Sequence, residues 1–184
     1  DFDRLAQEFA NAKHKHLVID DLRSVIEERL AIALRDNPLR VDFYKRYEAI
    51  IESYNSEQDK AMIEKTFNDL MRLSHDLDEK QRKWVREGFE NQQQMTVFEM
   101  LFKETLTPAE IRQVKAVAVE MVSAIERSLE GMVRWTEKAE TRDRVRLIVR
   151  DEVYKLPEES YPDSALGGCI DQIYDYFYTR DLAA

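Results

Sequence analysis

Glycine and proline are scarce in this chain, and the scarcity limits the folds that it can adopt. The 184 residues contain four glycines and four prolines. Sandwiches and barrels of short strands need a turn about every 8–12 residues, and turns favour these two residues. Glycine-rich phosphate loops are also missing, because the sequence holds neither G-x-x-x-x-G-K-[ST] nor G-x-G-x-x-G. A chain of helices joined by short links is therefore expected.

Apolar residues recur at helical spacing along nearly the whole chain. After Pro38, for example, they are spaced so that they share one helix face: Phe43, Tyr47, Ile50, Ile51 and Tyr54. No convincing strand pattern and no repeat of fixed period is present. The sequence predicts an all-α fold, a single compact domain of about eight helices in an irregular bundle.

Several boundaries can be predicted along the chain. Residues 1–36 are expected to form N-terminal connecting helices and residues 37–184 a C-terminal helical domain, together one continuous domain. Thr107-Pro108-Ala109-Glu110 has the pattern of a capping box at a helix start. A further helix is expected from about Val133 to Leu156, and two prolines predict a loop over residues 156–162.

Composition excludes several classes of protein. The net charge of −9 argues against a whole-surface nucleic-acid binder. The single Cys169 excludes a disulfide framework and suits a reducing cytosol, so a cytoplasmic location is expected. No apolar run approaches the roughly 18 residues of a membrane span, and no signal peptide is visible. Because the sequence opens at Asp1 without methionine, we interpret it as a fragment of a longer chain.

Residues suited to catalysis or metal binding are few. His14 and His16 lie two residues apart and point to different helix faces, while His75 is isolated in the sequence. Zinc needs four converging ligands, and cysteine supplies one at most. Cys169 has no nearby histidine in the sequence to activate it. We therefore expect no catalytic residue, no metal site and no cofactor in this stretch.

One segment contradicts the acidic total. Residues 134–150 contain six basic and three acidic side chains, and Lys138, Arg142, Arg146 and Arg150 are spaced by four. Such a stripe can follow a phosphate backbone or the carboxylates of a partner. The alternative is that the stripe is paired internally, because acidic residues are interleaved with it.

Aromatic residues crowd the C-terminal helix. Tyr174, Tyr176, Phe177 and Tyr178 cannot all face inward at once. Some aromatic surface is therefore expected to remain for a partner, with Tyr174, Tyr176 and Tyr178 as the candidates.

Four blocks of the sequence, in order, carry a resemblance to a known family. They are Asn37-Pro38-x-Arg40-x-Asp42-Phe43-Tyr44 continuing to Tyr54-Asn55; Ile63-Glu64-x-Thr66-Phe67-x-x-Leu70-Met71; Trp135 with Thr141-Arg142-x-x-Val145; and Leu156-Pro157 with Tyr161, leading into Cys169 and the aromatic tail. The chain resembles, over essentially its whole length, the C-terminal helical domain of the motor and endonuclease (R, or HsdR) subunit of type I restriction enzymes.

The resemblance implies a parent enzyme that uses ATP and Mg to translocate duplex DNA and cuts it far from the recognition site. In that family the motor and the nuclease lie in upstream domains, so this domain is implied to be non-catalytic. It is implied to dock on the methyltransferase and specificity subunits and to contact duplex DNA. The implied DNA or partner contacts are Lys138, Arg142, Arg144, Arg146 and Arg150, and the implied structural anchor is Trp135.

Two hypotheses remain open from the sequence. In the first, the chain is an assembly and DNA-guiding module of a larger nuclease. In the second, it is a purely structural helical scaffold that contacts protein only, with its basic helix neutralised internally. An independent small enzyme is disfavoured by the missing motifs.

Overall fold

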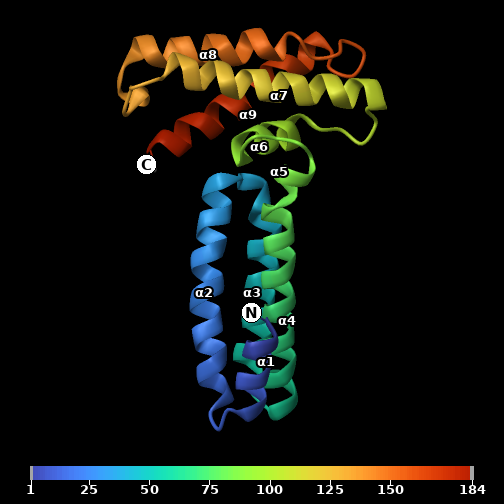
Figure 1. The fold of residues 1–184 in the computed structure, drawn as a ribbon, viewed down its shortest axis with the longest axis vertical. Coiled ribbons are helices and arrows are strands. Elements are labelled where there is room, and N and C mark those ends of the chain that lie inside the picture. The colour runs from blue at the N-terminus through green and yellow to red at the C-terminus, as the bar shows by residue number, and fades with distance from the viewer. Residues whose placement is uncertain (1, 183–184) are drawn as a thin grey trace. The chain divides into compact units, whose positions relative to one another are not determined.

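The structure, a computed structural model, describes residues 2–182. Within these residues the chain forms nine α-helices and two short 3₁₀ helices, with no strand (Figure 1). The predicted all-α fold is confirmed. Contacts along the backbone divide the chain into two compact units, residues 1–83 and 84–184, here called the N-terminal and C-terminal units. The expected boundary after residue 36 and the expected single continuous domain stay predictions.

The N-terminal unit is built from long helices that lie side by side (Figure 1). Its elements are α1 (Phe2–Asn11), α2 (Lys15–Asp36), η1 (Pro38–Arg40), α3 (Val41–Ser56) and α4 (Lys60–Gln81). Helix α4 packs against both α2 and α3. The short α1 is fixed to α4 by Phe9, whose ring stacks on that of Phe67 with 3.9 Å between the centroids.

The apolar periodicity explains why these helices pack. The buried face of α2 repeats every three or four residues: Ile19, Leu22, Ile26, Leu30 and Ala33. Helix α2 stops at Asn37, where the side chain accepts a hydrogen bond from the backbone N–H of Leu39 (3.0 Å) and Pro38 opens η1. Helix α4 starts at Asp59, whose carboxylate accepts from the N–H of Met62 (2.7 Å).

The C-terminal unit mixes long and short helices. Its elements are α6 (Gln92–Leu101), α7 (Pro108–Ser128), η2 (Trp135–Glu137), α8 (Ala139–Val153) and α9 (Asp163–Leu182), while the single turn α5 (Lys83–Arg86) spans the boundary. Each of the four longer helices packs on the next, and α9 returns to pack on α6. One apolar core lies between them.

Two of the predicted boundaries agree with the structure. Thr107 caps α7 through a capping box, because its hydroxyl accepts from the N–H of Glu110 (3.3 Å) and the Glu110 carboxylate accepts from the N–H of Thr107 (2.8 Å). The residues between Leu156 and Pro162 form the loop that joins α8 to α9.

The predicted helix from about Val133 to Leu156 is wrong at its start. Arg134 adopts the left-handed conformation (φ 56°, ψ 52°), which no α-helix continues through, and η2 follows it. Helix α8 begins only at Ala139. The reason is Trp135, which is buried in the core and needs this irregular entry to reach it.

Candidate interaction surface on helices α8 and α9

The start of α8 is fixed to the end of α9 by polar contacts. The Asp181 carboxylate accepts from the N–H (3.2 Å) and the hydroxyl (2.7 Å) of Thr136. The hydroxyl of Thr141 donates to the backbone oxygens of Trp135 and Lys138. Helices α8 and α9 therefore run antiparallel with a defined register, which decides which of their side chains meet.

Arg142, the arginine in the third family block, is used inside the fold. Its Nη1 donates to the backbone oxygen of Thr136 (2.7 Å), and the residue is half-buried. Burial raises the pKa of the neighbouring Tyr174, and the positive charge of Arg142 opposes that rise. Arg142 thus closes the entry turn of α8.

Arg146 bridges the two helices. Its Nη2 lies 2.5 Å from Oδ1 of Asp171 on α9, and its guanidinium lies 5.2 Å from the centre of the Tyr174 ring. The side chain is half-exposed in spite of these two contacts. An ion pair this exposed to water contributes little to stability.

The remaining basic residues face water. Arg144 pairs with Glu140 one turn earlier (3.1 Å), and Arg150 pairs with its neighbour Asp151 (2.9 Å). Lys138 precedes α8 as its cap residue and is exposed, and its side chain makes no hydrogen bond or ion pair with any described residue. Of the predicted stripe of Lys138, Arg142, Arg146 and Arg150, Lys138 therefore lies just outside α8, and Arg142 binds the backbone oxygen of Thr136.

Carboxylates outnumber arginines on the exposed surface of α8 and α9. The exposed basic residues of the two helices are Arg144, Arg146 and Arg150. The exposed acidic residues are Glu140, Asp143, Asp151, Asp163, Asp171 and Asp175. Three positive charges among six negative ones give a mixed and slightly acidic surface. Such a surface suits a protein of mixed charge better than a polyanion.

A groove of about 360 Å³ runs between α8 and α9. Leu147, Ile170 and Gly167 line its apolar part, and Leu147 is 47% exposed. Charged side chains line the rest: Asp143, Arg146, Arg150 and Asp171. Sequence reasoning missed this groove as a site, and the one signal in the sequence was the pair of glycines, Gly167 and Gly168, inside an amphipathic helix.

The aromatic residues of α9 separate into two groups. Tyr174 and Tyr178 are half-buried and pack edge-on against Trp135, each with 6.2 Å between ring centroids. Tyr176 is only 5% exposed and packs beside Phe177 in the core. The expectation that Tyr176 faces a partner is therefore corrected, because Ile173, Tyr176 and Phe177 share the inward face of α9.

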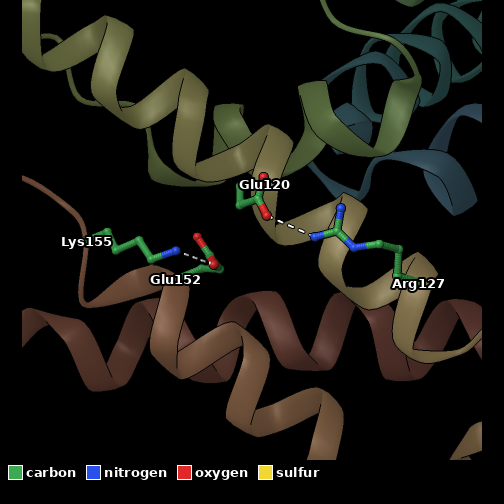
Figure 2. A network of polar contacts seen from close by, with 4 residues as sticks. All are labelled: Glu120, Arg127, Glu152 and Lys155. Atoms are coloured by element: carbon green, nitrogen blue, oxygen red, sulfur yellow. Dashed lines mark hydrogen bonds and ion pairs between the residues drawn. The ribbon is translucent and has the colours of Figure 1, made fainter.

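The inner edge of α8 carries a buried carboxylate (Figure 2). The Glu152 side chain is 9% exposed, and its Oε1 lies 2.6 Å from Nζ of Lys155. The other oxygen, Oε2, is buried and has no hydrogen-bond partner among the described residues. Figure 2 also shows Glu120 and Arg127, which pair along the exposed side of α7 (2.9 Å). A single carboxylate beside one lysine matches no catalytic arrangement.

The surroundings of Cys169 disfavour its thiolate form. Burial raises the pKa of the Cys169 thiol, and the charge of Lys103 offsets this only in part. A thiol shifted in this direction is a poorer nucleophile at neutral pH. Among residues 2–182 no three histidine, cysteine or carboxylate side chains converge as metal ligands. In the same range no helix has the length and apolar character to cross a membrane.

These observations define the class of protein first. The described chain is an all-α module whose polar side chains serve packing, turns and a mixed-charge surface. A family model described as the C-terminal region of type I restriction enzyme HindI endonuclease subunit-like proteins then matches residues 2–177. The chain belongs to this family. No curated protein and no solved structure matches it.

Proposed function

We propose that this chain is the assembly module of a type I restriction endonuclease subunit, and that it docks that subunit on the methyltransferase and specificity subunits. The supporting observation is the α8–α9 surface, where an open groove with an apolar floor lies among charges of both signs. Interfaces between proteins combine such apolar centres with polar rims. The family match gives the context, since a restriction endonuclease subunit works in a multi-subunit complex.

The proposal leaves the chemistry to other domains of the parent subunit. The proposal places no ATP or Mg²⁺ site in this chain, and it is supported by the lack of a phosphate loop in the sequence and of a metal-ligand cluster among residues 2–182. In this proposal, translocation and cleavage of DNA take place outside this chain. The parent complex is assigned to the cytoplasm, where a single unpaired cysteine stays reduced.

A deletion tests the docking role. Removing residues 1–184 from the full-length endonuclease subunit is expected to leave ATP hydrolysis intact, which shows that the motor is folded. The truncated subunit should fail to form a stable complex with the methyltransferase and specificity subunits, as measured by mass in solution. Assembly at full strength by the truncated subunit would contradict the docking role.

Contact with duplex DNA is the second candidate function. The observation in its favour is that Lys138, Arg144, Arg146 and Arg150 expose their cationic groups to water. The acidic side chains between them weigh against it. Replacing Arg144 and Arg150 by alanine in the full-length subunit should make DNA binding less salt-dependent, by about 0.9 in the log–log slope for each lost phosphate contact.

The control for this second test is Arg142→Ala. This arginine serves the entry turn of α8, so its loss should reduce helicity or stability and leave the salt slope as it was. An unchanged slope in the Arg144→Ala, Arg150→Ala protein would remove the DNA role and leave a scaffold that contacts protein only.

A further inference from the structure

We propose that the groove between α8 and α9 receives one apolar side chain from a helix of the methyltransferase–specificity core. The helix carries a basic residue that meets Asp143 and an acidic residue that meets Arg150, one on each side of that apolar side chain. This inference rests on the proposed docking function and assigns its contact surface.

Gly167 of α9 lies at the groove, on the exposed side of its helix. Gly167, Leu147 and Arg150 line the same groove, and a Cβ at Gly167 would meet no atom within 4 Å. Glycine is less favourable than alanine inside a helix, and nothing in the described chain comes close enough to require it here. No side chain of the C-terminal unit covers Leu147 completely, and Leu147 is 47% exposed.

The charges at the groove are incompletely used within the chain. Asp143 is exposed, and its side chain makes no hydrogen bond or ion pair with a described residue. Arg150 pairs only with Asp151, its neighbour in sequence, and both side chains are more than half exposed. Pairs of this kind form and break easily in water. Both residues can therefore accept a partner of opposite charge at little cost.

The spacing of these charges describes the partner. Asp143 and Arg150 lie seven residues apart, so they are two turns or about 10 Å apart along α8. Leu147 lies between them. A complementary helix carries a basic residue and an acidic residue two turns apart, with a leucine-sized side chain between. Ridges of one helix pack into the groove between two others, which favours a helix over an extended strand.

Nucleic acid does not match this groove. A phosphate backbone would need positive charge at both ends of the groove. Asp143 and Asp171 line the groove beside Arg146 and Arg150. A partner that carries charges of both signs can pair with all four of these side chains. The family suggests a multi-subunit complex, and under the proposed docking function its other subunits are the occupant.

Filling the groove is the direct test. Gly167→Leu in the full-length endonuclease subunit should weaken binding to the purified methyltransferase–specificity complex at least tenfold. The helicity of the variant should be unchanged or higher, since leucine favours helix. Gln172→Leu is the matched control, because it adds the same side chain at an exposed position of α9 outside the groove. It should bind as the unmodified subunit does.

Charge reversal is the second variant and does not depend on packing. Arg150→Glu should weaken binding to the same complex by about tenfold, whereas Arg112→Glu, at an exposed position of α7 outside the groove, should change it less than twofold. Each protein is first checked for unchanged ATP hydrolysis and helicity. Weakening by both groove variants, with both controls binding normally, supports the proposal.

The outcomes separate this inference from the docking role itself. If the groove variants bind normally and deletion of residues 1–184 abolishes binding, docking stands and the groove is overturned. If the deleted subunit binds as well, both proposals are overturned. If the endonuclease subunit alone forms a dimer that Gly167→Leu dissociates, the occupant is a second copy of this chain and the assigned partner is wrong.

Discussion

The two units of this chain use the same secondary structure but are stabilised differently. In the N-terminal unit several side-chain-to-backbone hydrogen bonds are local, as when Ser53 and Ser56 each donate to the oxygen four residues earlier. In the C-terminal unit some such bonds are also local, but others connect distant parts of the sequence. Lys103 donates to the oxygen of Ser160, and Tyr161 donates to that of Leu101, 60 residues away.

Both of these long-range bonds lie at the end of the short helix α6. Helices α2 and α4 have 22 residues each, so a continuous apolar face can fix their alignment over six turns. Helix α6 has 10 residues, and the loop after α8 returns the chain to it. A short helix has less apolar surface to define its position. Hydrogen bonds from polar side chains to backbone carbonyls help to fix the position of such a short helix.

The ion pairs of the N-terminal unit follow the same logic. Some of them join one long helix to another, as Arg46 joins α3 to Asp76 on α4 (2.9 Å) and Arg29 joins α2 to Asp78 on α4. These polar contacts add to the apolar packing between the helices and do not replace it. The comparison teaches that the first unit depends mainly on apolar burial and the second on burial together with specific polar contacts.

The largest effect on stability is expected from a substitution in the apolar face of the N-terminal unit. Leu70→Ala removes a side chain that is fully buried (0% exposed) on α4. The loss of transfer free energy and the cavity should lower the free energy of unfolding by about 2–5 kcal/mol. Hydrogen exchange of the amides of α2–α4 measures this. Leu17→Ala, at a position 55% exposed, should change stability by less than about 0.5 kcal/mol.

The next effect breaks a polar contact of the C-terminal unit. Tyr161→Phe removes the hydroxyl that donates to Leu101 and leaves a carbonyl at the end of α6 without that donor. The expected loss is about 1–2 kcal/mol in the free energy of unfolding, measured in urea. Phe43→Leu, a comparable change of a buried ring in the N-terminal unit, leaves no polar group unpaired. If the free energy of unfolding of the two variants depended on alkaline pH in the same way, the assigned contact would be contradicted.

The pH dependence of this contact has a defined sign. Burial is the main cause that raises the pKa of Tyr161 to about 12, above the ordinary tyrosine value. The folded state holds the proton more tightly than the unfolded state does. Its contribution is therefore fully present below pH ~10 and is lost as the pH rises from about 10 towards 12. Tyr161→Phe should lack this alkaline decrease in stability.

A smaller effect of opposite sign concerns Glu152. Its buried Oε2 has no donor among the described residues, and an unsatisfied buried acceptor costs stability. Glu152→Met keeps a similar volume and should raise the free energy of unfolding by about 1 kcal/mol, because Lys155 remains exposed to water. Glu120→Met on the exposed side of α7 is the control and should be nearly neutral. Destabilisation by Glu152→Met would show that this carboxylate stabilises the packing of α8.

The sequence was sufficient for what depends on local pattern. The apolar faces of the long helices and the capping box at Thr107 follow from residue spacing alone. The start of α8 could not be predicted in the same way. It depends on Trp135, which packs between Tyr174 and Tyr178 of α9, and no local signal reports a partner about 40 residues away.

The groove could not be predicted for the same reason. Its residues come from two helices, and they meet only in the antiparallel register that Thr136 and Asp181 fix. The spacing of four among the basic residues suggested one stripe. The structure gives each a different environment, since Arg142 reaches a backbone oxygen while Arg146 reaches Asp171. Helical periodicity predicts which residues share a face, but not what lies opposite that face.

The smallest expected effect sharpens the role of loop contacts at acid pH. The Ser160 hydroxyl, followed by the backbone and hydroxyl groups of Thr107, lowers the pKa of the Glu110 carboxyl. A lowered pKa stabilises the fold above the ordinary carboxyl value of about 4.3, and this stabilisation is lost as the pH falls through the lower folded value. Glu110→Gln should therefore be less stable than the unmodified protein near pH 7, with the difference shrinking as the pH drops below about 4. Urea unfolding followed across this range measures it, with the exposed Glu104→Gln as the control. A difference that stays constant with pH would mean that the Glu110 charge does not stabilise the start of α7, and that the capping box works through its neutral hydrogen bonds alone.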